Sequence, residues 1–191
     1  MKKLFSFRRR RADGPDEQFG TGLWRHNHDR FLRAVDRYYT TALAIHTAAP
    51  TDAAGEGSAP TEPAAAGQPT HEPGATAPEP AAASARDAIM AGTHRLNDLA
   101  TEIDEITAWL HTHCPVDGQV VPGPVRRVVG DTPELLTRAS SKVAEAVLAA
   151  SMARAGTATL TSTATATERY ITDAAELLAQ VRRILAEADA R

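Results

Sequence analysis

The chain of 191 residues is long enough for one domain with tails, and aromatic residues make up only 5% of it, so a core would be poor in large side chains. The formal net charge of −3 hides an asymmetry, because residues 1–11 carry six cations and no acid and leave −9 for the rest of the chain. An acidic body does not favour nucleic-acid binding, which needs a basic face. The single cysteine excludes an internal disulfide and fits a reducing cytosol.

Residues 1–20 are expected to form a basic, flexible tail, with a hinge at residues 12–20. Apolar and cationic side chains at its start could bind an anionic membrane surface, since each cation there contributes on the order of 1 kcal/mol. A solvated tail and contact with nucleic acid are the alternatives. The residues expected to touch the membrane are Lys2, Lys3, Leu4, Phe5, Phe7, Arg8, Arg9, Arg10 and Arg11.

The first long helix is predicted over residues 21–49, where apolar and aromatic residues recur every seven positions with a second set between them. Arg25 and Asp29, and likewise Asp29 and Arg33, stand four residues apart on the outer side and are expected to support the helix as ion pairs. The predicted buried positions are Trp24, His28, Phe31, Val35, Tyr38, Ala42 and Ile45.

A second helix is predicted over residues 84–113, with Ser84 as its N-cap and Pro115 just beyond its end. Between the two helices, residues 50–83 are rich in Ala, Pro, Thr, Gly and Glu and lack periodicity, so a disordered linker is expected. The acids Asp98, Glu102, Asp104 and Glu105 fall off the apolar stripe, on the outer, solvent-facing side. The predicted buried stripe comprises Ile89, Leu96, Leu99, Ile103, Ile106, Leu110 and His113.

Residues 114–130 are too rich in valine for a free loop, and we expect them to fold back on one end of the bundle as a small hairpin. Arg126 and Arg127 precede a helix start, where they could bind an anion or pair with nearby acids.

Two further helices are predicted over residues 133–154 and 166–189. Pro133 marks the first turn of the former and Gly156 its end. Threonines alternate with other residues from Thr157 to Thr167, which predicts an extended segment, and Thr165 with Glu168 predicts a capping box for the last helix.

These elements predict an all-α fold: a four-helix up-down bundle with heptad-patterned helices over residues 21–191, interrupted by the linker and preceded by the basic tail. No apolar run reaches the roughly 20 residues that span a bilayer. The heptads are equally compatible with pairing between chains, so self-association stays open.

Enzyme signatures are lacking: the sequence holds no nucleophile elbow, phosphate-binding loop, dinucleotide fingerprint or di-iron Glu-x-x-His pair. One group of residues could have metal chemistry, namely His28, His111, His113 and Cys114. If the first two helices are antiparallel, these side chains meet at one bundle end, and imidazole and thiolate suit zinc. The alternative to a metal site is that these polar residues simply cover the end of the bundle, where they are partly exposed to solvent.

We therefore expect a non-enzymatic helical adaptor or scaffold of the bacterial cytosol, without a cofactor, that binds protein partners and is held peripherally at the inner membrane face by its tail. A zinc-binding helical bundle is the alternative function.

Overall fold

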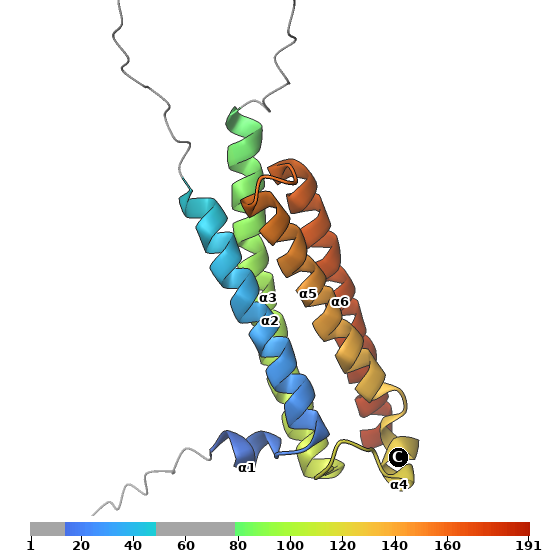
Figure 1. Cartoon of the computed structure of the whole chain (residues 1–191). Helices are drawn as coiled ribbons and strands as arrows, with labels where there is room; N and C mark the ends of the chain where they lie inside the picture. Colours follow the sequence, from blue (N-terminus) through green and yellow to red (C-terminus); the bar gives the residue numbers. More distant parts are fainter. Residues whose placement is uncertain (1–13, 49–78) are drawn as a thin grey trace, which may run out of the picture.

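The computed structural model describes residues 14–48 and 79–191, and within those ranges the chain is helical, with short connections and no strand (Figure 1). The four long helices pack against one another, so the expected all-α helical bundle is confirmed. The predicted membrane-contact residues 1–11 and most of the predicted linker lie outside the described residues. The helices are α1 (Pro15–Phe19), α2 (Leu23–Thr47), α3 (Glu79–His113), α4 (Gly123–Val129), α5 (Thr132–Arg154) and α6 (Leu160–Asp189).

The long helices alternate in direction along the chain, but they are not arranged around the bundle in chain order. Helix α2 packs on α3 and α5, and α6 also packs on α3 and α5, so α3 and α5 lie on a diagonal. The bundle is thus a pair of antiparallel hairpins, α2–α3 and α5–α6, set side by side (Figure 1). Contacts between the hairpins join parallel helices, α2 with α5 and α3 with α6.

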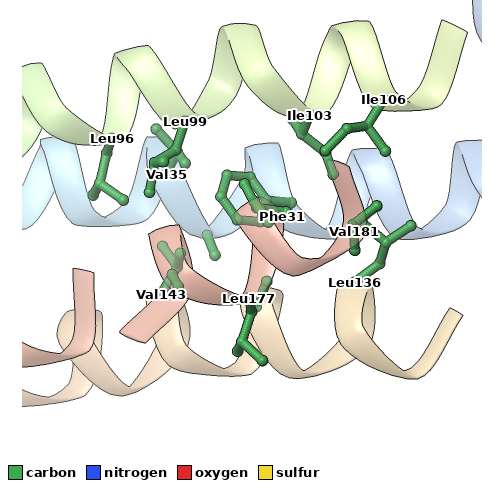
Figure 2. Packing of buried hydrophobic residues seen from close by; sticks show 14 of the residues in the cluster. Phe31, Val35, Leu96, Leu99, Ile103, Ile106, Leu136, Val143, Leu177 and Val181 are labelled. Atoms are coloured by element: carbon green, nitrogen blue, oxygen red, sulfur yellow. The ribbon is translucent and has the colours of Figure 1, made fainter. Parts of the chain in front are cut away.

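The core follows the predicted stripes. Figure 2 shows Phe31 of α2 among side chains contributed by the other long helices. Phe31, Tyr38 and Leu96 are fully buried, and each such side chain contributes about 1.5–3 kcal/mol relative to an exposed one. The predicted position of His113 on the buried stripe is wrong, because the helix ends there and its ring is exposed.

Two aromatic side chains of α2 also fix how α3 lies against it. Trp24 donates from Nε1 to the carbonyl of Cys114 over 2.8 Å, and the Tyr38 hydroxyl donates to the carbonyl of Ile89 over 2.9 Å. The start of α2 is therefore beside the end of α3, which is the antiparallel orientation assumed for the sequence.

Two helix starts differ from the prediction. Helix α3 begins at Glu79, so Ser84 lies inside it rather than at its cap, because the alanine-rich stretch before Ser84 favours helix and Pro80 is tolerated in a first turn. Helix α6 begins at Leu160, where the Thr159 side chain accepts a hydrogen bond from the Ser162 amide.

The predicted extended threonine segment and its capping box at Thr165 are therefore wrong. The alternation of threonines hid a helical spacing, since Thr163, Thr167 and Ile171 recur every four residues and all three are buried. Thr165 instead donates from its hydroxyl to the carbonyl of Thr161, inside the helix.

The two ends of the first hairpin also differ from expectation. Residues 15–19 of the predicted hinge form α1, whose Phe19 is buried. The connection over residues 114–130 does fold back on the bundle end, with Val129 fully buried, but it contains helix α4 instead of a hairpin. Pro124 suits a first helical turn and gives this segment a helix start.

Gly92 lies inside α3 where the bundle is tightest. A Cβ there would lie 2.7 Å from the Tyr38 hydroxyl and 2.9 Å from Ile171 Cδ1, closer than side chains pack. The Tyr38 hydroxyl is held by its bond to the Ile89 carbonyl and has little room to move. Glycine is therefore required here by the close approach of three helices.

We predict that Gly92→Ala lowers the free energy of unfolding by about 1–3 kcal/mol, since overpacking outweighs the gain in helix propensity. Urea denaturation measures this. The control is Ala91→Gly at the exposed neighbouring position, which should cost about 1 kcal/mol through propensity alone. A stabilised Gly92→Ala variant would contradict the close packing.

Candidate functional site

The buried His28 is the centre of a polar clasp near the start of α2, and the start of this helix is at the lower end of the bundle in Figure 1. Its Nδ1 lies 3.0 Å from Asp29 Oδ1, its Nε2 lies 2.7 Å from Asp104 Oδ1, and its ring stacks on Phe19 with centroids 4.2 Å apart. The clasp therefore joins α1, α2 and α3. Asp104 was predicted to be on the wet side, but it is half-buried and reaches His28.

The other predicted zinc ligands lie at the same bundle end but have separate surroundings. His113 stacks on Trp109 with centroids 4.5 Å apart. His111 packs against Gly20, where a Cβ would lie 2.6 Å from its Nδ1. Cys114 is buried, and burial raises the pKa of its thiol, which disfavours the thiolate that a metal requires.

These residues do not converge on a metal position. Both ring nitrogens of His28 already face an aspartate, Nδ1 facing Asp29 and Nε2 facing Asp104, so the ring is engaged on both sides. Within the described ranges, no group of three or more His, Cys, Asp or Glu side chains is placed to hold a metal ion. The zinc site stays a prediction for which this part of the chain supplies no assembled ligand set.

A groove runs between the parallel helices α2 and α5, and we call it the α2–α5 seam. Its hollows have volumes of about 620, 430 and 370 Å³ and follow one another from the α4 end upward. The first is lined by Leu23, Asn27, Gln119, Val120, Val121, Arg126, Pro133, Glu134, Thr137 and Arg138. The others are lined by Arg30, Arg33, Ala34, Asp36, Arg37, Thr40, Thr41, Ser140, Ala144, Val147, Leu148 and Ser151.

Ion pairs or side-chain hydrogen bonds cross the other contacts between long helices. Arg182 of α6 pairs at 2.6 Å with both Glu102 and Glu105 of α3, and Arg95 of α3 pairs with Glu168 of α6. The α5–α6 contact is crossed by an ion pair between Lys142 and Asp173, and the α2–α3 contact by the hydrogen bond between His28 and Asp104. Glu102 and Glu105, predicted to lie on the outer face of their helix, thus link α3 to α6.

No ion pair crosses the α2–α5 seam in the described part of the chain, although three exposed arginines, Arg30, Arg33 and Arg37, line its α2 side. The predicted pair of Arg25 with Asp29 is confirmed at 2.7 Å, but among the described residues Arg33 has no such partner. Arg126 pairs with Glu134 at 2.5 Å, in agreement with the acid-pairing alternative for that residue.

Of the three seam arginines, sequence reasoning named only Arg33, and it named it as an ion-pair partner of Asp29 instead of as part of a binding face. Their signal is the spacing of three and then four residues, which places cations in one row on a helix face beside the apolar stripe.

Comparisons of the chain with protein families, with curated proteins and with solved structures found no match. None of the described helices has the length and apolar character needed to cross a bilayer.

The clasp makes the stability of the fold depend on pH in the acid range. Burial raises the pKa of Asp29, but hydrogen bonds from His28 and Arg25 and their charges outweigh it, so the pKa lies below its ordinary 3.8. A lowered folded-state pKa gives a stabilisation that is present above the ordinary value and is lost as the pH falls through the folded value.

We predict that Asp29→Asn lowers the free energy of unfolding at pH 7 by about 0.5–1 kcal/mol, as expected for ion pairs screened by solvent. The same variant should lose less stability than the wild type between about pH 4 and pH 2. Urea denaturation across this range measures both effects. Asp98→Asn, at an exposed carboxylate of α3, is the matched control; an equal change in both variants would contradict the role of the clasp.

Proposed function

We propose that this protein is a non-enzymatic helical adaptor or scaffold, which binds a protein partner along the α2–α5 seam. The carrying observation is the contrast between this seam and the other contacts of the bundle. The described residues leave Arg30, Arg33 and Arg37 on its α2 side without acidic partners, while Leu148 on its α5 side is 62% exposed. Unpaired cations beside an apolar side chain are typical of a surface that a partner covers.

The rigid arrangement around the seam supports this function. Each helix of the seam also packs on a second helix. The aromatic side chains of α2 hydrogen-bond to α3 and to the residue that follows it. Helix α5 packs on α6. A groove held between well-packed helices is already formed before a partner arrives, which reduces the entropy lost on binding.

We further propose that residues 1–11 hold the adaptor at an anionic membrane surface on the cytosolic side. The support is the sequence, in which six cations and the apolar Leu4, Phe5 and Phe7 stand together. Helix α1, the first described element after these residues in the chain, lies at the bundle end that carries the clasp (Figure 1).

Co-sedimentation with anionic liposomes tests the membrane proposal. We expect the full chain to bind at low salt and to be released at moderate salt, because cations and anionic lipid attract electrostatically. The chain of residues 12–191 should stay in the supernatant. Equal binding by both chains, or binding by neither, would contradict a membrane role of the tail.

A photo-crosslinking amino acid at Leu148 tests the adaptor function in native cells. Light should join the full chain to a discrete partner protein, because this side chain lies in the seam and is exposed. The control places the same amino acid at exposed Asp98 of α3, away from the seam. The absence of an adduct from Leu148, or the same adducts from both positions, would overturn the proposal.

A further inference from the structure

The α2 side of the seam is a row of positive charge. Arg30, Arg33 and Arg37 stand at spacings of three and four residues, so their side chains emerge on one face of the helix over about 10 Å. Asp36, which lines the upper hollow, is one acid on the same helix against these three cations. The row therefore keeps a positive excess that attracts an acidic group.

The floor of the seam is made by small and apolar side chains. Ala34, Ser140 and Ala144 leave the space between the helices open, and Val147 with Leu148 adds apolar surface on α5. The lining runs along α2 from Leu23 to Thr41, a helical length of about 27 Å. This shape and length suit a helix of about five turns laid into the groove.

We propose that the seam binds an amphipathic helix of the partner protein, with acidic residues beside a stripe of small apolar residues. This inference rests on the proposed adaptor function and specifies the chemistry of its partner. The acids of the partner helix face the arginine row, and its apolar stripe covers Val147 and Leu148. A second copy of the chain does not fit a symmetric pairing through this face, because two arginine rows would then meet. The apolar floor and the acidic body favour a peptide over nucleic acid.

Fluorescence anisotropy of the full chain with a labelled synthetic helix tests the inference. The probe is a peptide of about 18 residues with glutamates every three to four positions beside an Ala/Leu stripe, and its control has glutamine at every glutamate. We expect the glutamate peptide to bind about tenfold more tightly than the control and to lose affinity as salt rises.

Two triple variants of the chain test whether the peptide binds at the arginine row of the seam. Arg30→Gln, Arg33→Gln and Arg37→Gln combined should weaken binding of the glutamate peptide about tenfold. The matched control neutralises three exposed arginines away from the seam, Arg169, Arg183 and Arg191, and should change the affinity less than about twofold.

Three results would overturn the acidic-helix inference: no binding of the glutamate peptide, equal loss in both arginine variants, or tighter binding of a single-stranded RNA oligonucleotide that the seam variant abolishes. The adaptor function is judged separately by crosslinking from Leu148. An adduct in cells without binding of the glutamate peptide would keep the adaptor and reject the acidic helix, whereas failure of both would reject the adaptor as well.

Discussion

Burial of the α2 aromatic side chains against the other three long helices is the interaction on which this bundle depends. Phe31 and Tyr38 are fully buried and Trp24 is 1% exposed, while much of the surrounding core is alanine. Small residues let the helices approach closely, and the three aromatic side chains supply much of the buried area. Trp24 also donates a hydrogen bond to the carbonyl of Cys114, just after α3, and Tyr38 donates one to the carbonyl of Ile89 within α3. These two bonds orient the first hairpin.

The placement of the hairpins explains why one seam stays open. Because the connection through α4 crosses the bundle end, α2 comes to lie parallel to α5 and α3 parallel to α6. The α3–α6 contact is closed by the ion pairs of Arg95 and Arg182. The α2–α5 contact has small residues on its floor and cations on its α2 side, so its described residues leave both space and charge for a partner.

The sequence predicted the fold class and most of the core because heptad spacing reports directly which positions face inward, as at Phe31 and Leu96. It could not predict which helices become neighbours, since α2 could bury the same stripe beside α5 or diagonal to it. The clasp was missed for a similar reason: His28 was predicted to be buried, but its partner Asp104 is a long-range contact without a local signal. Thr163 and Thr167 were predicted to lie in an extended segment because threonines alternate there with other residues. The same residues also fit a helical spacing of four, and in the structure both are buried on one helix face.

The side-by-side placement of α2 and α5 is the central claim, and spin-label distances in solution test it most directly. Labels would be attached at cysteines replacing Arg33 and Leu148 in one protein, and Asp98 and Leu148 in another, both with Cys114→Ala. Neighbouring helices lie about 8–10 Å apart, and diagonal ones about 1.4 times as far. The structure predicts a clearly shorter distance for Arg33 with Leu148 than for Asp98 with Leu148. The opposite order would place α5 beside α3 and remove the seam.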